Sequence, residues 1–192
     1  MPSSINKQQW RQQLRVIRQQ CANRDGAKGR KLVADMIARS LSSMQEWQQA
    51  QCIASYRSIG DELDPSVLSA LARQDHKRVV YPRITGPGLM SFCDWREGEP
   101  LETSLAGITQ PTAAATIAAI DEIDFFIIPL LGCDLTGLRL GYGGGFYDRA
   151  LMGTQGFRCG IGYQAQLVVK LPREDHDVAL RGMVTEAGIN RF

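Results

Sequence analysis

The sequence predicts an α/β fold built on a largely parallel sheet. Segments in which apolar residues recur at helical spacing alternate with short apolar runs of strand length. The run "DFFIIP" (124–129) shows no polar alternation, which indicates a strand buried on both faces of a sheet. Helices that alternate with such strands are typical of a parallel sheet with helices packed on its faces.

Helices are predicted first at the N-terminus. The first predicted helix runs from Asn6 to about Ala22, and Asn6 with Gln9 has the spacing of an N-terminal cap. The apolar residues of this helix form one stripe: Trp10, Leu14, Ile17 and Cys21. A second helical pattern covers "GRKLVADMIARSLSSMQEW" (29–47), and Pro65 opens a third helix at the first helical position, where proline is favoured.

Strands are predicted where short apolar runs are bounded by turn residues. These runs are "CIASYR" (52–57), "RVVYP" (78–82), "LMSFCDW" (89–95), "DFFIIP" (124–129) and "FRCGIGY" (157–163). After Pro129 we expect ten residues of loop, then a glycine-rich stretch that runs into a helix near Phe146. No repeat and no linker divides the chain, so one domain over residues 1–192 is expected.

Composition excludes several classes of protein. With 22 basic and 20 acidic residues, the formal net charge is +2, far from the excess of a general nucleic-acid binder. No run approaches the roughly 18 apolar residues of a membrane span, and the polar start has no secretory apolar region. The five cysteines form no C-x-x-C pair, and their odd number argues against a disulfide framework. We therefore expect a cytoplasmic protein with mostly buried thiols, without nucleic-acid, membrane or obligate protein partners.

The stretch "RLGYGGGFYDR" (139–149) is the strongest functional signal. It lies after the buried strand 124–129, at the edge of an α/β sheet where ligands bind. Backbone N–H groups of a glycine loop and of a helix start can converge on an anion, which suits a polyphosphate. Arg139 and Arg149 would add positive charge, and Asp148 would hold a magnesium ion that bridges phosphate oxygens.

Known glycine motifs do not fit this stretch. A P-loop needs a lysine after its glycines, and Phe146 stands where the dinucleotide fingerprint needs its last glycine. The alternative is a flexible surface turn whose glycines merely permit positive φ. The aromatic residues that flank the glycines argue against that alternative.

Several segments, in matching order and spacing, are similar to those of one known family. The chain reads "IIPLLGCDLTGLRLGYGGGFYDR" (127–149), and the shorter matches are "KQQWR" (7–11), "YRSIGDELD" (56–64), "VVYPR" (79–83), "GITQP" (107–111) and "LPREDHDVALRGMVTE" (171–186). The chain thus resembles the 5-formyltetrahydrofolate cyclo-ligase (methenyltetrahydrofolate synthetase) family, in which a stretch close to "FDxxGxRLGYGGGYYDR" follows a buried strand that ends in proline.

The resemblance implies a three-layer α/β/α Rossmann-like fold of the NagB/RpiA/CoA transferase-like type. It also implies that ATP and Mg²⁺ drive closure of 5-formyltetrahydrofolate to 5,10-methenyltetrahydrofolate, with release of ADP and phosphate. The expected course is transfer of the γ-phosphoryl group to the formyl oxygen, attack by N10 on the activated carbon and loss of phosphate. Such a reaction is catalysed mainly by positioning and by countering charge. It needs no Ser-His or Cys-His pair, which fits the presence of only two histidines.

Site residues follow from the same resemblance. The ATP contacts would be Lys7, Gln8, Gln9, Trp10, Arg11, Arg139, Leu140, Gly141, Tyr142, Gly143, Gly144, Gly145, Phe146 and Tyr147. The catalytic residues would be Lys7, Arg139 and Arg149, the substrate-binding residues Tyr56, Arg57 and Glu62, and the magnesium ligands Asp148 and Asp177. A carboxylate such as Glu62 suits the pterin, whose amino and ring N–H groups donate hydrogen bonds.

Each assignment has a structural alternative. Lys7 and Arg11 share one helix face at i, i+4 spacing, and without the resemblance they read as a solvated basic face that continues through Arg15 and Arg18. The two aspartates, 148 and 177, would otherwise be helix caps or surface charges, and Glu62 an N-terminal helix cap.

Departures from the family pattern remove no charged group. Phe146 replaces a tyrosine, which puts one hydroxyl contact to phosphate in doubt. Cys133 replaces the phenylalanine of "FD", Leu130 stands where glycine is usual, and Trp10 replaces a leucine.

Two other functions remain open at the level of sequence. A non-catalytic relative would bind reduced folate or nucleotide without turnover, and would need neither Asp148 nor the lysine and arginine set. A different ATP-dependent enzyme, such as a kinase acting on another small acid, would use the same nucleotide loop with another substrate segment.

Overall fold

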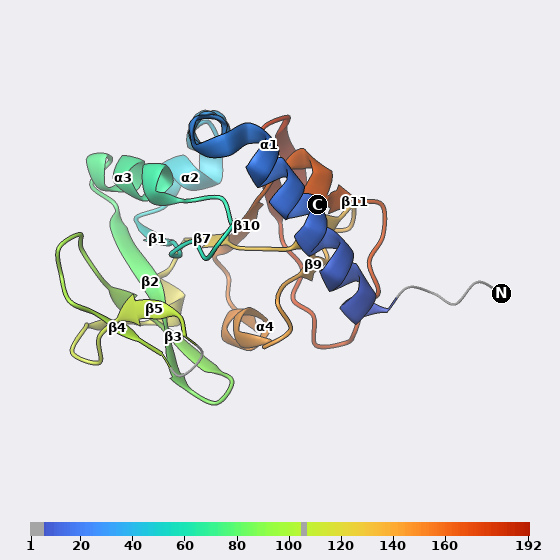
Figure 1. Cartoon of the computed structure of the whole chain (residues 1–192). Coiled ribbons are helices and arrows are strands. Elements are labelled where there is room, and N and C mark those ends of the chain that lie inside the picture. The colour runs from blue at the N-terminus through green and yellow to red at the C-terminus, as the bar shows by residue number, and fades with distance from the viewer. Residues whose placement is uncertain (1–5, 105–106) are drawn as a thin grey trace.

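The structure, a computed structural model, describes residues 6–104 and 107–192. Its centre is an eight-stranded sheet of order β13-β12-β10-β7-β1-β2-β3-β6. Figure 1 labels the middle strands of this sheet, β10, β7, β1, β2 and β3. The strands are β1 (Cys52–Ala54), β2 (Arg78–Gly86), β3 (Leu89–Asp94), β6 (Ile117–Ala118), β7 (Phe125–Ile128), β10 (Phe157–Ile161), β12 (Gly182–Thr185) and β13 (Gly188–Arg191). The inner strands β12, β10, β7, β1 and β2 pair in parallel, whereas β13, β3 and β6 pair antiparallel at the two edges. The predicted α/β fold with a mostly parallel sheet is confirmed.

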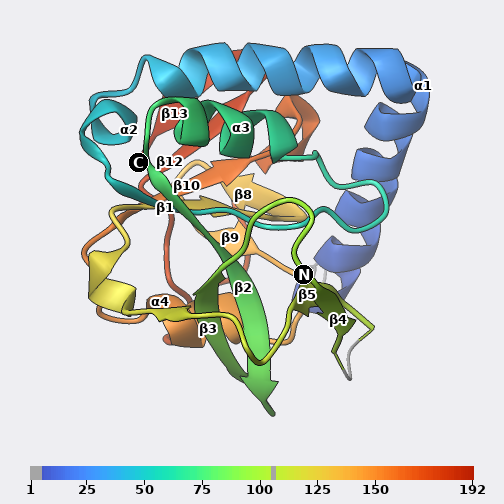
Figure 2. The same ribbon diagram turned by 90° about the vertical axis from the view of Figure 1, so that its left-hand side faces the viewer.

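Helices lie on both faces of this sheet. Figure 2 shows α3 and the second half of α1 on one face and α4 on the other. The helices are α1 (Lys7–Ser42), α2 (Gln45–Gln49), α3 (Ser66–Gln74) and α4 (Phe146–Leu151), with short 3-10 helices at Ile120–Glu122 and Gln164–Gln166. The three-layer arrangement is therefore as predicted.

Strand β7 explains how the two cores form. Successive side chains of a strand point to opposite faces of the sheet. Phe125 and Ile127 accordingly join the core beneath α1, α2 and α3, whereas Phe126 and Ile128 join the core on the α4 side. All four are at most 1% exposed, which explains why the run "FFII" shows no polar alternation.

Helix α1 begins as predicted and bends where glycine interrupts it. The Asn6 side chain accepts a hydrogen bond from the Gln9 N–H, and the Gln9 side chain accepts one from the Asn6 N–H. Gly26 has non-helical backbone angles (φ 59°, ψ −170°), and the helix changes direction there (Figure 2). The predicted separate helix over 29–47 was wrong in its bounds. Its first part continues α1 beyond the bend to Ser42, and its last residues belong to α2.

Two further boundaries differ from the prediction. Pro65 is the N-terminal cap of α3 rather than its first helical residue. The ten residues after Pro129 are not a plain loop, because β8 (Gly132–Asp134) and β9 (Arg139–Leu140) pair antiparallel there, and β8 also pairs in parallel with β11 (Leu167–Val168). The Asp134 side chain closes the turn between β8 and β9 by accepting from the N–H groups of Thr136 and Leu138.

A two-stranded sheet of β4 (Leu101–Thr103) and β5 (Thr109–Pro111) lies beside β2. Gln110, from the segment "GITQP", joins the two by hydrogen bonds to both the N–H and the carbonyl of Ile84.

All five cysteines are free and buried, as predicted. Among the helices of the described ranges, none has the length and apolar character needed to cross a bilayer.

Candidate active site

A cavity of about 540 Å³ opens beyond the carboxyl ends of the central parallel strands. Pro129, directly after β7, and Tyr56, two residues after β1, form part of its wall, as expected for a ligand site in an α/β sheet. Its other walls come from the start of α1, from β2 and β3, from the glycine loop (residues 141–145) and from Glu174, His176 and Asp177. Segments far apart in the chain therefore meet in one place.

The glycine loop connects β9 to α4, and α4 begins at Phe146 as predicted. Gly143 (φ 104°) and Gly145 (φ 65°) have left-handed backbone angles that favour glycine. The loop is held in place, because Arg11 Nε donates to the Gly141 carbonyl at 3.1 Å and Arg149 donates to the Gly144 carbonyl. These contacts argue against the alternative of a merely flexible turn.

Lys7 and Arg11 both line the cavity from the first two turns of α1. The Lys7 side chain is only 12% exposed, and its ammonium lies 2.7 Å from Asp177 Oδ1 and 3.0 Å from Glu174 Oε2. A solvated basic face is therefore the wrong description of Lys7. It is wrong for Arg18 as well, which is buried, at 3% exposed.

Four residues assigned from the motif do not line the cavity: Gln8, Gln9, Trp10 and Arg149. Gln8 is exposed, Gln9 caps α1, and Trp10 packs against the apolar cluster of Leu14, Leu138 and Leu140. Arg149 donates to the carbonyls of Gly88 and Gly144, so it fastens the glycine loop to the turn between β2 and β3. The structure thus does not bring these four side chains into the site as the resemblance implied.

Arg139 and Asp148 form an ion pair at the cavity wall. Arg139 Nη2 donates to Asp148 Oδ2 at 3.0 Å, and the Arg139 guanidinium lies over the Tyr147 ring, 5.4 Å from its centroid. Asp148 Oδ1 accepts from the Val178 N–H. The side chain of Arg139 is 5% exposed and that of Asp148 is 17% exposed, so this pair is largely removed from water.

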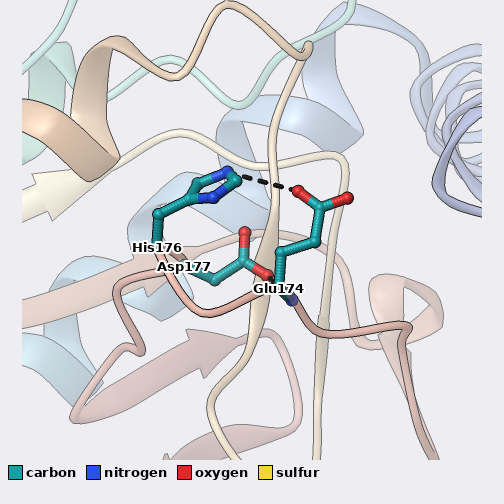
Figure 3. Close-up of side chains that lie close together, drawn as sticks. All are labelled: Glu174, His176 and Asp177. Carbon is teal, nitrogen blue, oxygen red and sulfur yellow. Dashed lines mark hydrogen bonds and ion pairs between the residues drawn. The ribbon is translucent and has the colours of Figure 1, made fainter.

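Asp177 belongs to a cluster that the sequence did not reveal (Figure 3). One ligand atom each of Glu174, His176 and Asp177 lies within 4.8 Å of the others, and His176 Nε2 is 3.2 Å from Glu174 Oε2. Asp148 is not a member of this group. The two aspartates predicted to bind magnesium therefore line one cavity but have different neighbours.

The predicted substrate segment also reaches the cavity, through Tyr56, Arg57 and Glu62. Glu62 Oε2 accepts from the Ile59 N–H at 2.9 Å, which closes a tight loop after β1. Because α3 begins at Ser66 with Pro65 as its cap, Glu62 is not a helix cap, and that alternative was wrong. The Arg57 guanidinium lies over the Trp95 ring, 4.9 Å from its centroid.

Burial changes the acid–base properties of this side of the cavity. It raises the pKa of the Glu62 carboxyl, against the opposing effects of the Ile59 N–H and of Arg18. It also raises the pKa of the hydroxyls of Tyr56, Tyr142 and Tyr147, which therefore stay protonated at neutral pH. The segment thus offers one carboxylate among neutral hydroxyl groups.

Several lining residues were missed by sequence reasoning. Glu174 and His176 stand in the quoted segment "EDHD", yet only Asp177 was assigned from it. The apolar part of the wall comes from Pro82, Ile84, Met90 and Ile108. Arg18, which does not line the cavity but contacts Tyr142 in its wall, carried a usable signal, because it lies four residues after Leu14 and three before Cys21, on the buried face of α1.

A second cavity, of about 650 Å³, lies near the start of β2 and holds none of the predicted site residues. Its main charged groups are already paired. Arg78 binds both oxygens of Asp94, and Lys77 donates to the Ala50 carbonyl at 2.7 Å. Although this cavity is larger, the smaller one has the chemistry of a site.

Comparisons with known proteins agree with the resemblance read from the sequence. The model of the 5-formyltetrahydrofolate cyclo-ligase family matches residues 3–186. A 5-formyltetrahydrofolate cyclo-ligase of Haemophilus influenzae is 31% identical over 181 residues, which cover 91% of this chain and 94% of that protein. One of Escherichia coli is 32% identical over 146 residues, which cover 73% of this chain and 80% of that protein.

Solved structures give the same result for the fold. The NMR structure of the Aquifex aeolicus 5,10-methenyltetrahydrofolate synthetase superposes with a TM-score of 0.82 at 26% identity, covering 96% of this chain and 92% of that one. A 5,10-methenyltetrahydrofolate synthetase from Mycoplasma pneumoniae, at 22% identity and a TM-score of 0.69, covers 90% of this chain and 98% of its own and supports the fold alone. On the family match and these relatives, the chain belongs to the 5-formyltetrahydrofolate cyclo-ligase family.

Proposed function

We propose that residues 1–192 form one 5-formyltetrahydrofolate cyclo-ligase domain. It would convert 5-formyltetrahydrofolate and ATP to 5,10-methenyltetrahydrofolate, ADP and phosphate, with Mg²⁺. The observation that carries the proposal is the meeting of the glycine loop and the segment of Tyr56, Arg57 and Glu62 in one cavity of about 540 Å³. Family membership supports the same reaction.

The nucleotide would lie against the glycine loop. Lys7, Arg11 and Arg139 line the cavity beside this loop, so they are placed to counter the charge of the phosphates. Arg149 would act indirectly, since it holds the carbonyl of Gly144 rather than facing the cavity. We therefore assign phosphate contact to Lys7 and Arg139, and positioning of the loop to Arg149.

Mg²⁺ would be held by Asp148 and Asp177. Magnesium in nucleotide sites is bound by one or two carboxylates together with phosphate oxygens. The cavity supplies carboxylate oxygens from these two aspartates and from Glu174. The donor set therefore fits the ion. Bound there, Mg²⁺ would neutralise charge on the phosphate oxygens during transfer.

The reduced folate would occupy the side of Glu62 and Arg57. Glu62 would accept hydrogen bonds from the pterin N–H groups, and the apolar wall of Pro82, Ile84 and Met90 would contact its rings. This arrangement would place the formyl group between the pterin segment and the glycine loop. The chain then has to align the formyl oxygen with the γ-phosphorus and exclude water.

The bonds of the reaction balance without a protein nucleophile. An O–P bond forms at the formyl oxygen as ADP leaves. N10 next attacks the formyl carbon, a proton leaves N10, and the C–O bond breaks to release phosphate. The cationic Lys7 and Arg139 would stabilise the phosphate charge in the first and last of these steps.

The test is the near-ultraviolet absorbance of the methenyl product, followed with 5-formyltetrahydrofolate in the presence and absence of Mg-ATP. We expect product only with Mg-ATP, loss of turnover in Lys7→Met, and normal turnover in Lys31→Met, whose lysine lies on the exposed part of α1. ATP hydrolysis without folate turnover would favour a different phosphoryl acceptor. Folate binding without turnover would favour a non-catalytic relative.

We also infer a cytoplasmic location. Each of the five cysteines is free and buried, which suits a reducing compartment. If the protein is denatured and treated with a thiol-blocking reagent directly on isolation, five blocked thiols would support this inference. A disulfide would oppose it.

A further inference from the structure

Arg18 is a buried cation with partners from several segments. It is 3% exposed, and arginine is almost never buried without being paired. Its Nη2 donates to Asp61 Oδ1 at 2.8 Å and to the Tyr142 hydroxyl at 2.6 Å, and its Nη1 donates to the Leu130 carbonyl at 3.3 Å. The same Nη1 lies 3.5 Å from Glu62 Oε1. One guanidinium therefore contacts four residues.

Three of these four partners belong to the two parts of the proposed site, and the fourth, Leu130, lies after β7. Tyr142 is a residue of the glycine loop, and Asp61 and Glu62 belong to the proposed substrate segment. Arg18 itself is on α1, the helix that carries Lys7 and Arg11. The nucleotide side and the folate side thus share a single charged side chain.

The position of Tyr142 depends on this arginine. The Arg18 guanidinium lies 5.4 Å from the centroid of the Tyr142 ring in addition to binding its hydroxyl, while Arg15 lies 5.7 Å from the same centroid. Tyr142 is 47% exposed and lines the cavity. A ligand that moves or orders Tyr142 must therefore act on the Arg18 guanidinium.

The charge of Glu62 depends on Arg18 as well. Burial raises the pKa of Glu62, and Arg18 works against that rise. The other groups that face Glu62 are Asp61 on its own segment, Tyr56 after β1, Tyr142 on the glycine loop and Tyr147 on α4. Because these are acids or neutral hydroxyls, Arg18 is the cation among them that, together with the Ile59 N–H, favours the ionised form of the carboxyl.

We propose that Arg18 is a positioning residue that couples the glycine loop to the substrate segment, so that each ligand strengthens binding of the other. The proposal rests on the proposed function, because it takes ATP and 5-formyltetrahydrofolate as the two ligands. A nucleotide that fixes Tyr142 fixes Arg18, and Arg18 then holds Asp61 and Glu62 in the geometry that accepts the pterin. By linkage, the folate must tighten nucleotide binding by the same factor.

The experiment measures the dissociation constant of 5-formyltetrahydrofolate with and without a non-hydrolysable ATP analogue and Mg²⁺. In the wild-type protein we expect the analogue to tighten folate binding at least about fivefold, the lower end of usual coupling between sites. The ratio of the folate dissociation constant without the analogue to that with it falls to about one in Arg18→Gln and Tyr142→Phe. Arg15→Gln is the matched control, since Arg15 stacks on the same ring from an exposed position, and it retains the ratio.

A pH profile separates this role from a merely structural one. Without Arg18 the pKa of Glu62 rises further, so the pH above which folate binds is higher in Arg18→Gln than in the wild type, while Arg18→Lys restores part of the difference. Should Arg18→Gln not fold, Tyr142→Phe removes one hydroxyl from an exposed ring and decides the coupling by itself.

The outcomes also separate this inference from the proposed function. A ratio of one in the wild type, or an unchanged ratio in Tyr142→Phe and Arg18→Gln, overturns the coupling while folate binding stays intact. Failure of the wild-type protein to bind 5-formyltetrahydrofolate at all overturns the proposed function, and the coupling with it.

Discussion

The Lys7 ammonium lies 2.7 Å from Asp177 Oδ1 and 2.8 Å from Asp177 Oδ2, which joins the first residue of α1 to the segment after β11. Both side chains are largely buried, at 12% and 8% exposed. A proposed phosphate ligand and a proposed metal ligand therefore neutralise each other in this structure. Nucleotide phosphate would compete for Lys7, and Mg²⁺ would compete for Asp177.

Replacing Asp177 by asparagine tests the metal assignment. In Asp177→Asn we expect the Mg²⁺ concentration for half-maximal turnover to rise about tenfold or more, because a charged oxygen ligand is lost. The measurement is turnover against free Mg²⁺ at saturating folate. Asp175→Asn is the control, since it makes the same charge change on an exposed neighbour that does not line the cavity. An unchanged magnesium dependence in Asp177→Asn and also in Asp148→Asn would show that the ion binds elsewhere.

Replacing Gly143 by alanine tests the glycine loop. Gly143 has φ 104°, and an added Cβ would lie 3.2 Å from Arg11 Cζ. Left-handed backbone costs an L-residue roughly 1–2 kcal/mol. We expect Gly143→Ala to raise the KM for ATP more than the KM for folate, because the loop shifts at the phosphates.

Gly153→Ala is the matched control for that variant. Gly153 has φ 78° and nothing within 4 Å of an added Cβ, so it makes a similar backbone change away from the cavity. Both variants should lose stability in denaturant unfolding, while Gly153→Ala keeps both KM values. Equal kinetics in the two variants would contradict a nucleotide role for the loop.

The sequence predicted those parts of the site that depend on local chemistry. The glycine loop and the start of α4 at Phe146 follow from backbone preferences of neighbouring residues. On α1 the structure separates the residues that the motif assigned together. Successive residues of a helix are turned by about 100°, so Lys7 and Arg11 reach the cavity while Gln8, Gln9 and Trp10 between them do not.

Features that depend on tertiary contacts were not predicted. The sequence offered Arg18 only as part of an alternative solvated basic face, although its spacing from Leu14 places it on the buried face of α1. Its partners come from segments far along the chain, so they could not be predicted. Strands β8 and β9 have three and two residues. Runs this short have no periodicity to detect.

Asp134 supports the turn between β8 and β9, and its loss should destabilise the fold. It is 1% exposed, and its carboxylate accepts from the N–H groups of Thr136, Leu138 and Leu171 and from the Thr136 hydroxyl. Asp134→Asn turns an amide NH₂ toward these donors, and we expect a loss of about 3 kcal/mol in the free energy of unfolding. Urea unfolding at pH 7 measures it, with exposed Asp75→Asn as a control that changes little.

The same carboxylate sets a dependence of stability on pH. Burial favours the protonated form of Asp134, but the hydrogen bonds outweigh it and lower its pKa. A carboxyl with a lowered pKa in the folded state contributes stability above its unfolded pKa, near 3.9, and loses it as pH falls through the folded value. The difference in stability between wild type and Asp134→Asn should therefore shrink at acid pH. A constant difference would contradict this account.

The five cysteines should react slowly in the folded protein. Burial raises the pKa of Cys133 and of Cys159 to about 12, and that of Cys52 to about 11. Since the thiolate is the reactive form, few of these groups react at neutral pH. A chromogenic disulfide reagent should label five thiols in guanidinium and few in the native protein. Fast labelling of native protein would show that a cysteine is more accessible than the structure indicates.

Glu62 should favour binding at the expense of stability. Burial raises its pKa, although the Ile59 N–H and Arg18 favour the ionised form. For a carboxyl whose pKa is raised on folding, stability falls as pH rises from the unfolded pKa through the folded one. The ionised side chain is therefore a cost at higher pH. Glu62→Gln, which keeps the shape and removes the charge, should leave the free energy of unfolding at pH 7 unchanged or higher.

Affinity for 5-formyltetrahydrofolate should change in the opposite direction. Hydrogen bonds to a charged group contribute about 1.5–3 kcal/mol, so the loss of the carboxylate is expected to weaken binding at least about tenfold. Equilibrium binding and urea unfolding of the wild type, Glu62→Gln and the exposed control Glu97→Gln give both quantities. Weaker binding without loss of stability identifies Glu62 as a ligand of the folate. Loss of both together would make Glu62 a structural residue of the loop after β1, and unchanged affinity would remove it from the substrate pocket.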